Sequence, residues 1–366
     1  MENKYNSHTR ALIEEAFRKV QEFNYKKYIE ELNKPIPQNR RLRKHPVNEI
    51  LEMFGLHLIR KSLLNELERN LYSKMGKWSS VGTLQLALEN PHEFDEVYNL
   101  FTDEDSKSTF DWFIQFRVAY AFLGEAAKFV FPPRISYEEF INKVSGIKLD
   151  HNSFITIGNY KFASNPEAVA GSWIFEQYNL KGLCEVSSGD YVVDGGAFKG
   201  ETAFWFLSKG AGRVYAFDGD DINFEALFKN VMLNKVEDRI VPLKVLLSDK
   251  DGTSKIKMTG SASSSILVNE GTEVECTTLD SFVVKNNIER IDFIKLDVEG
   301  AEIDVLKGTV ETIRKCKPKM AISVYHKPED IILITSFLRG LLSESKFYLR
   351  HFSDNFSETV LFVNPR

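Results

Sequence analysis

The sequence has few cysteines and few prolines. Its 366 residues include 3 Cys and 11 Pro. Cys184, Cys276 and Cys316 lie far apart, and the sequence contains neither a Cys-x-x-Cys pair nor a Cys/His cluster. A structural zinc site therefore lacks a recognisable set of ligands. We expect the three cysteines to be reduced and structural.

Long apolar runs and an excess of positive charge are also missing. No uninterrupted span reaches the ~18 apolar residues that a bilayer crossing requires. The first ten residues, MENKYNSHTR, lack the apolar stretch of a secretory signal. The formal net charge of −5 gives no overall positive field to hold a nucleic-acid backbone. We therefore expect a soluble, cytoplasmic protein with no membrane span and no nucleic-acid partner.

Helical periodicity dominates residues 1–150. Apolar positions from Thr9 to Leu32 recur at steps of three and four, which predicts an amphipathic helix that packs on its own helical domain or pairs two subunits. The basic, proline-containing segment Lys34–Pro46 predicts a linker. Helical patterns return at residues 50–59 and 110–122. We predict that this region serves substrate recognition or homo-oligomerisation. A connecting strand and helix are expected to follow it at residues 151–189, with the helix running from Asn165 to Tyr178.

From Asp190 to the end, short β-rich runs alternate with amphipathic helices. Helical patterns separate the first six of seven runs, which is the βαβ signature of a parallel sheet. The last two runs are joined by a loop too short for a parallel crossover, so the final strand must return antiparallel. Two further β-like pieces, Ser254–Met258 and Thr272–Thr277, predict an inserted hairpin. The seven predicted strands are Tyr191–Asp194, Arg213–Phe217, Ile240–Leu247, Ile291–Asp297, Lys319–Tyr325, Phe347–His351 and Thr359–Val363.

A glycine turn follows the first predicted strand, in the segment VVDGGAFKGET from Val192 to Thr202. A turn without side chains lets a ligand lie against backbone N–H groups. The glycine spacing does not fit G-x-G-x-x-G, and a carboxylate at Asp194 would repel a pyrophosphate. That carboxylate suits a ligand with a cationic amino-acid end, such as S-adenosylmethionine. A βα turn with structural glycines is the alternative.

Acidic residues also follow the next two strands. Asp218 ends the second strand, where a carboxylate can accept both ribose hydroxyls. NAD sites use the same device, so Asp218 indicates a nucleoside-bearing cofactor without choosing which. Ser248 and Asp249 follow the third strand, where they could meet an adenine amino group or form an ordinary turn.

The fourth and fifth strands end in ionisable residues. Asp297 and Glu299 follow the fourth strand, at the edge where open α/β sheets bind ligands. Glu302 fits the first turn of the next helix, where it favours the helix dipole. His326 follows the fifth strand at the same edge, as a structural group or as a proton acceptor.

These segments together resemble the FkbM family of S-adenosylmethionine-dependent methyltransferases. The resemblance runs from about Asp190 to Val363 and is carried by VVDGGAFKGET, VYAFDGD, TTLDSF, DFIKLDVEGAEIDVLKG, KPKMAISVYHKPEDI and ETVLFV. It implies an α/β, class I methyltransferase (Rossmann-like) fold over residues 190–366, with five parallel strands and a C-terminal antiparallel hairpin. It also implies O-methylation, often of sugar or polyketide hydroxyls. The pair Asp218-Gly219 departs from the Glu-Pro that family members more often show.

The resemblance also assigns roles to residues. Asp194, Gly196 and Gly200 would face the methionine part of the cofactor, and Asp218 its ribose. Asp297, Glu299 and His326 would face the acceptor. The predicted cofactor-binding residues are Asp194, Gly195, Gly196, Ala197, Gly200, Thr202, Asp218, Ser248, Asp249 and Asp297.

We therefore predict an O-methyltransferase that uses S-adenosylmethionine and acts on a hydroxyl of a sugar, a glycan or a small natural product. His326 is the expected base, with Asp297 and Glu299 orienting the imidazole and the acceptor. A divalent metal held by these three residues is the chemical alternative, although the predicted site is metal-free. The competing functions are a NAD-linked oxidoreductase and a catalytically silent module that binds the cofactor or a protein partner.

Overall fold

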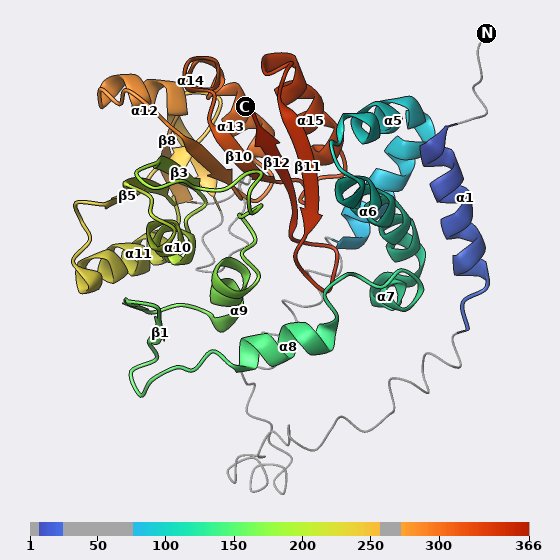
Figure 1. The fold of residues 1–366 in the computed structure, drawn as a ribbon, viewed down its shortest axis with the longest axis horizontal. Coiled ribbons are helices and arrows are strands. Elements are labelled where there is room, and N and C mark those ends of the chain that lie inside the picture. Colours follow the sequence, from blue (N-terminus) through green and yellow to red (C-terminus); the bar gives the residue numbers. More distant parts are fainter. Residues whose placement is uncertain (1–6, 25–75, 257–271, 366) are drawn as a thin grey trace, which may run out of the picture.

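The computed structural model describes residues 7–24, 76–256 and 272–365 (Figure 1). The predicted linker Lys34–Pro46, the helical pattern at residues 50–59 and the end of the helix predicted to reach Leu32 lie outside the described residues.

The N-terminal part of the described chain is helical. Its elements are α1 (His8–Gln21), a helix over residues 76–89, α5 (Pro91–Leu100), α6 (Glu104–Leu123), a 3-10 turn (Gly124–Ala126), α7 (Ala127–Val130) and α8 (Tyr137–Ser145). The Asp103 side chain caps α6 by accepting the Ser106 N–H. The apolar stripe of α1 packs against α5 and α6, which is the first of its two predicted outcomes. Pairing of two subunits stays a prediction.

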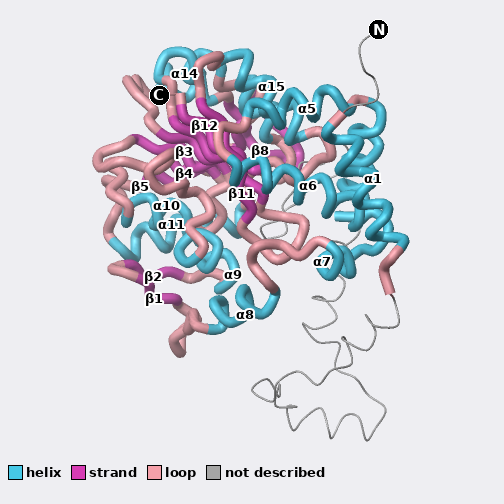
Figure 2. The backbone as a smooth tube through the Cα atoms, turned by 45° about the vertical axis from the view of Figure 1, so that its right-hand side comes forward, coloured by secondary structure: helices cyan, strands magenta, loops and turns pink. Residues whose placement is uncertain are grey.

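A mixed seven-stranded sheet forms the centre of the molecule (Figure 2). In spatial order it contains β11 (Lys346–His351), β12 (Thr359–Asn364), β10 (Lys319–Ser323), β9 (Phe293–Leu296), β3 (Tyr191–Gly195), β4 (Arg213–Phe217) and β5 (Ile240–Leu243). The pairs from β10 to β5 are parallel, and β12 pairs antiparallel with both β10 and β11. The predicted α/β class, with a mixed sheet and a helical N-terminal region, is confirmed.

Helices cover both faces of this sheet. Val192 and Val193 in β3 point to opposite faces, because neighbouring strand residues alternate, and each joins a separate apolar core. The core around Val192 includes α10 (Glu201–Ser208) and α11 (Asp221–Asn234). The core around Val193 includes the four helices α12 (Leu279–Lys285), α13 (Glu302–Lys307), α14 (Val310–Cys316) and α15 (Asp330–Leu341). It continues into α1, α5 and α6.

The third predicted strand, Ile240–Leu247, is wrong in its extent. β5 ends at Leu243, and Leu246–Leu247 forms β6 in a second sheet with β7 (Gly252–Ile256) and β8 (Thr272–Thr277). β5 is the edge strand of the sheet, so Pro242, which has no backbone N–H, is tolerated there without the loss of a ladder hydrogen bond. The predicted inserted hairpin is present as the antiparallel pair β7–β8.

The connecting segment also differs from its prediction. Its strands are β1 (Ile155–Ile157) and β2 (Tyr160–Phe162). The helix expected from Asn165 to Tyr178 is short: α9 (Pro166–Val169) widens into a π-helical turn (Ala170–Ile174). Gly171, which weakens a regular helix, lies within this turn. The chain leaves the helix early and carries Gln177 and Tyr178 to the ends of the strands.

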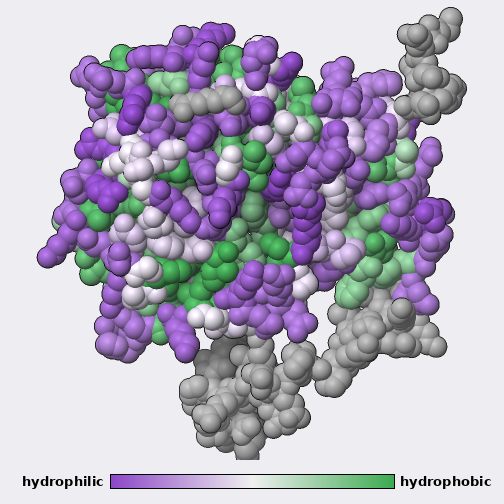
Figure 3. Space-filling view, viewed as in Figure 1, coloured by the Kyte–Doolittle hydropathy of each residue, from purple (hydrophilic) through white to green (hydrophobic). Residues whose placement is uncertain are grey.

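None of the helices in the described ranges is long and apolar enough to cross a membrane. Hydrophilic side chains cover most of the face in Figure 3, with smaller hydrophobic areas between them.

Candidate active site

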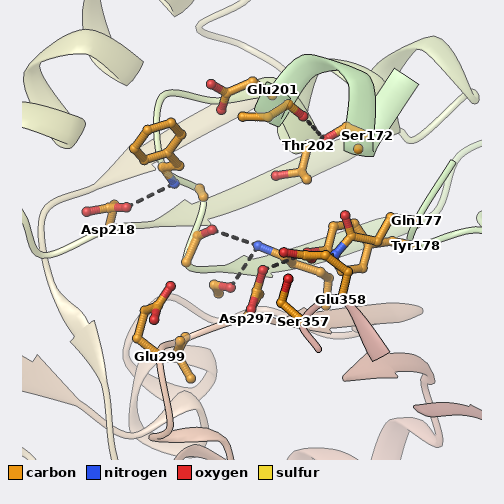
Figure 4. Close-up of a pocket in the computed structure, with 18 of the residues that line it drawn as sticks. Ser172, Gln177, Tyr178, Glu201, Thr202, Asp218, Asp297, Glu299, Ser357 and Glu358 are labelled. Atoms are coloured by element: carbon orange, nitrogen blue, oxygen red, sulfur yellow. Dashed lines mark hydrogen bonds between the residues drawn. The ribbon is translucent and has the colours of Figure 1, made fainter. Parts of the chain in front are cut away.

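A cavity of about 500 Å³ lies at the carboxyl ends of the parallel strands, within the size range of small-molecule sites. The glycine turn after β3 and the loops after β4, β9 and β10 line it. Residues from α8 to Tyr178 and the loop between β11 and β12 complete the lining. In Figure 4, Asp218 lies on one side of the cavity, Gln177, Tyr178 and Glu358 gather on the other, and Asp297 lies between them.

The glycine turn lines the cavity, but its N–H groups already have partners. The N–H groups of Gly196 and Ala197 both donate to the Phe217 carbonyl, at 3.0 and 2.9 Å. The expectation that a ligand lies against free N–H groups of this turn is therefore wrong at these two residues. The turn instead ties β3 to β4. Gly200 does not line the cavity; it has a φ of 99° and serves as N-cap of α10.

Asp194 is fully buried and does not line the cavity. Its Oδ1 lies 3.0 Å from Nζ of Lys295, and its Oδ2 accepts a hydrogen bond from the Thr202 hydroxyl at 2.5 Å. Lys295 Nζ also donates to the carbonyls of Gly195 and Gly196, at 3.1 and 2.6 Å. Asp194 therefore acts on the cavity through Lys295 and Thr202, which both line it, and not by direct contact.

Asp218 lines the cavity at the end of β4, as predicted. Its Oδ2 accepts the Phe198 N–H and its Oδ1 accepts the Asp220 N–H, both at 2.9 Å. Burial raises the pKa of Asp218 to about 7. A carboxylate has about four lone-pair sites, so each oxygen keeps capacity for a ligand hydroxyl.

Ser248 and Asp249 lie outside the cavity. Ser248 is tied to β8 through its N–H, which donates to the Thr277 carbonyl at 3.0 Å, and Asp249 is exposed. The cavity wall beside β6 is apolar and is formed by Val245, Leu246 and Leu247. This region offers packing surface and not the polar contacts expected from Ser248 and Asp249.

His326 enters the cavity from the end of β10 and is surrounded by carboxylates. Its Nδ1 lies 3.0 Å from Oε1 of Glu302, and its Nε2 lies 3.6 Å from both Asp297 Oδ1 and Glu299 Oε2. Burial alone would lower the pKa of His326, but the charges of Glu302 and Glu299 outweigh burial and raise it well above its usual value. Three predicted catalytic residues are thus brought together, and Glu302 joins them.

Asp297 and Glu299 differ in their environments. Tyr178 donates its hydroxyl to Asp297 Oδ2 at 2.7 Å, and the Tyr325 hydroxyl lies 3.3 Å from Oδ1. The pKa of Asp297 is lowered because the charges of His326 and Lys295 outweigh burial. Burial raises the pKa of Glu299 to about 8. Glu299 has a φ of 56°, which is an uncommon backbone conformation for a residue other than glycine. Such backbone strain is often found at functional sites.

Glu358 is a cavity carboxylate that the sequence analysis missed. It has a φ of 65° and is the residue immediately before β12. Its carboxylate accepts hydrogen bonds from the Gln177 amide and, at 3.4 Å, from the Tyr325 hydroxyl. Burial and the nearby charge of Asp297 raise its pKa to about 7. A glutamate just before a predicted strand was the available signal, but only the fold shows that it faces Asp297.

Asp297, Glu302 and His326 each place one possible ligand atom within 4.8 Å of the others. Carboxylate and imidazole ligands suit several divalent metals. The set contains Glu302 where the sequence pattern offered Glu299. However, Oε1 of Glu302 already accepts the Val298 N–H at 2.8 Å besides contacting His326. The geometry thus also fits a metal-free role, in which Glu302 holds the loop and the imidazole.

Comparison with known proteins identifies the class and the family of part of this chain. Residues 194–347 match the model of the methyltransferase FkbM domain. This part of the chain belongs to the FkbM methyltransferase family. No curated protein matches the chain in a sequence comparison.

A solved methyltransferase structure supports the fold. The match to the methyltransferase FkbM from Methylobacillus flagellatus KT has a TM-score of 0.53 at 18% identity and covers 76% of this chain. This chain spans 59% of the length of that protein. A putative rRNA methylase from Clostridium thermocellum is more distant, with a TM-score of 0.33 at 14% identity, covering 49% of this chain and 88% of that one. Fibrillarin from Aeropyrum pernix, solved with natively bound S-adenosyl-L-methionine, gives 0.32 at 15%, covering 52% and 74%.

Proposed function

We propose that the chain is an O-methyltransferase with a class I fold that uses S-adenosylmethionine and acts on a hydroxyl of a sugar, a glycan or a small natural product. One observation carries the proposal: within an FkbM domain, Asp218, Asp297, Glu299 and His326 line a single cavity. One cavity thus contains both a group that can bind the ribose of the cofactor and groups that can accept the proton released in methyl transfer.

The cofactor side of the cavity fits a cationic nucleoside. Asp218 can accept ribose hydroxyls, and Val245, Leu246 and Leu247 can pack on an adenine ring. Asp297, in contact with His326 and Tyr178, gives negative charge toward the centre of the cavity. That charge attracts a sulfonium or an ammonium and opposes a pyrophosphate, which disfavours the NAD-linked alternative.

The chemistry requires alignment and a proton acceptor. S-adenosylmethionine, when bound, supplies a methyl group that is already activated on a sulfonium, and with it a positive charge. The pKa of His326 would fall with that charge nearby, because the neighbouring carboxylates would be partly offset. Glu302 favours a proton on Nδ1, which leaves Nε2 to accept the proton of the acceptor hydroxyl. Asp297 and Glu299 each place a carboxylate oxygen 3.6 Å from Nε2, so they can orient the imidazole and the acceptor.

The acceptor side is polar, with two aromatic rings. Gln177, Asn355 and Glu358 can hydrogen-bond to hydroxyl groups, and Phe140 and Phe352 can pack on the apolar face of a ring. The nearby carboxylates oppose an acceptor that carries phosphate. These features support a neutral acceptor with several hydroxyl groups.

Methyl transfer itself is the test. The full-length chain is incubated with S-adenosylmethionine labelled in its methyl group and with neutral glycans, polyhydroxylated natural products, protein and RNA. We expect label in an ether of the neutral polyhydroxyl acceptors. Transfer only to protein side chains or to nucleic acid would contradict the proposed acceptor.

A further inference from the structure

A buried arginine of the helical region contacts two segments that carry cavity residues. Arg117 lies in α6 and is only 1% exposed. Its Nη2 donates to the carbonyl of Tyr325 and to that of Phe356, both at 3.0 Å. Its Nη1 donates to the Ser79 hydroxyl at 2.8 Å. One side chain of the helical region therefore joins the end of β10 to the loop between β11 and β12.

Both carbonyls lie next to residues of the candidate site. Tyr325 directly precedes His326, and its own hydroxyl contacts Asp297 and Glu358. Phe356 stands two residues before Glu358. The backbone positions that aim His326 and Glu358 into the cavity are thus held at a fixed separation by one guanidinium group.

The geometry of this contact requires arginine. The guanidinium carbon lies 4.9 Å from the centre of the Phe113 ring and 5.4 Å from that of Phe356, so the planar group also packs on aromatic rings. A planar group with several fixed donors can serve Ser79 and both carbonyls at once. A lysine ammonium keeps the charge but lacks this fixed arrangement of donors.

We propose that Arg117 is a positioning residue through which the helical region sets the geometry of His326 and Glu358. The inference rests on the proposed function of the same cavity. It gives the helical region an indirect part in catalysis, because Arg117 itself does not line the cavity. Asp218 is held by Phe198 and Asp220, so the cofactor side does not depend on this contact.

Arg117→Lys in the full-length chain is the main test. A displacement of His326 by about 1 Å is expected to lower kcat about 10–100-fold, to raise the KM of the acceptor, and to leave the affinity for S-adenosylhomocysteine unchanged. Ser79→Ala, which removes one acceptor of Nη1, should change kcat in the same direction by less. If Arg117→Lys does not fold, Ser79→Ala decides.

Arg350→Lys is the matched control. Arg350, in β11, also joins the sheet to α6, because its Nη2 lies 2.7 Å from Asp103 Oδ2 and its Nη1 contacts Asp103 and Ser106. Neither Arg350 nor these two partners line the cavity. We expect this variant to keep the wild-type kcat and KM. Equal losses of kcat in Arg117→Lys and Arg350→Lys would overturn the proposal, because the helical interface alone would then explain them. Wild-type kinetics in Arg117→Lys would overturn it as well.

A second readout does not depend on turnover. The imidazole of His326 is followed by NMR over a pH titration in histidine-labelled protein and is identified by its absence in His326→Ala. We expect the titration of His326 to shift in Arg117→Lys and to stay unchanged in Arg350→Lys. An unchanged titration in Arg117→Lys would contradict the positioning role. Absence of methyl transfer by the wild-type chain would instead contradict the proposed function, and the titration would still test Arg117.

Discussion

Nδ1 of His326 lies 3.0 Å from Oε1 of Glu302, and both side chains are buried. The same Glu302 oxygen accepts the Val298 N–H, so one carboxylate links the loop after β9 to the histidine after β10. The contact leaves the opposite ring nitrogen facing Asp297 and Glu299. Glu302 therefore does more than favour the dipole of α13, which is the only role that the sequence indicated.

His326→Ala should lower turnover about 10²–10⁴-fold, because the variant loses the proposed proton acceptor. The affinity for S-adenosylhomocysteine should stay near that of the wild type, since Asp218 is untouched. Steady-state kinetics and calorimetry measure the two quantities. His92→Ala, at an exposed histidine outside the cavity, is the control. Near-normal turnover in His326→Ala would remove His326 as the base.

The pH dependence of kcat/KM should report the titration of His326 in the free enzyme. Burial lowers the pKa of His326, but Glu302 and Glu299 raise it to well above its usual value. The proton acceptor must be neutral, so kcat/KM should fall as the pH drops below this raised pKa. Glu302→Gln removes one of the charges that raise the pKa and should move the acid limb to lower pH. A limb that stays in place would contradict the assignment.

Asp218→Ala should weaken binding of S-adenosylhomocysteine through the ribose. Loss of a charge-assisted hydrogen bond costs about 1.5–3 kcal/mol, or roughly tenfold to a hundredfold in Kd. Asp221→Ala is the control, because Asp221 is an exposed residue that pairs with Lys244 outside the cavity. Unchanged affinity of Asp218→Ala in calorimetry would exclude Asp218 from the cofactor site.

Gly196→Ala should disrupt the site, whereas Gly182→Ala should not. The two glycines have φ of 75° and 73°, so the cost of the backbone conformation is about the same in both variants. A Cβ on Gly196 would lie 1.9 Å from the Asp297 carbonyl oxygen, while a Cβ on Gly182 would meet nothing within 4 Å. Urea denaturation should show a clearly larger loss of stability in Gly196→Ala, together with loss of turnover. Equal losses in both variants would contradict the close approach of the two strand ends.

Removal of divalent ions should have little effect on activity. The carboxylate and imidazole groups fit a metal, but Glu302 already contacts His326 and the Val298 N–H. Dialysis of the chain against EDTA followed by a transfer assay measures the effect, with an untreated sample as control. Activity that is lost to EDTA and restored by a divalent ion would instead favour the metal alternative with Asp297, Glu302 and His326.

The order of strands and the residues at their ends could be predicted from local sequence. Each parallel strand is a short β-rich run followed by a helix, so local sequence predicts where its carboxyl end lies. It therefore also predicts which residues stand there, such as Asp218, Asp297 and His326. The antiparallel return of β12 followed from the short loop before it. Strand extent was harder: Ile240–Leu247 reads as one apolar run, but β6 pairs with β8, which lies far along the chain.

Contacts between distant segments could not be predicted from the sequence. Gln177 and Tyr178 were expected inside a helix, and a π-helical turn brings them to the cavity instead. Glu358 faces Asp297 only because β12 lies beside β10. Local sequence shows the residue types and their spacing, whereas these contacts depend on the packing of segments that are distant in the chain, such as Tyr178 and Asp297, which are 119 residues apart.

Calorimetric titration of the full-length chain with S-adenosylhomocysteine and, separately, with NAD tests the central claim most directly. The account predicts one binding site for S-adenosylhomocysteine, weakened in Asp218→Ala and unchanged in Asp221→Ala, and no heat of binding with NAD. Binding of NAD without binding of S-adenosylhomocysteine would contradict the account and favour an oxidoreductase.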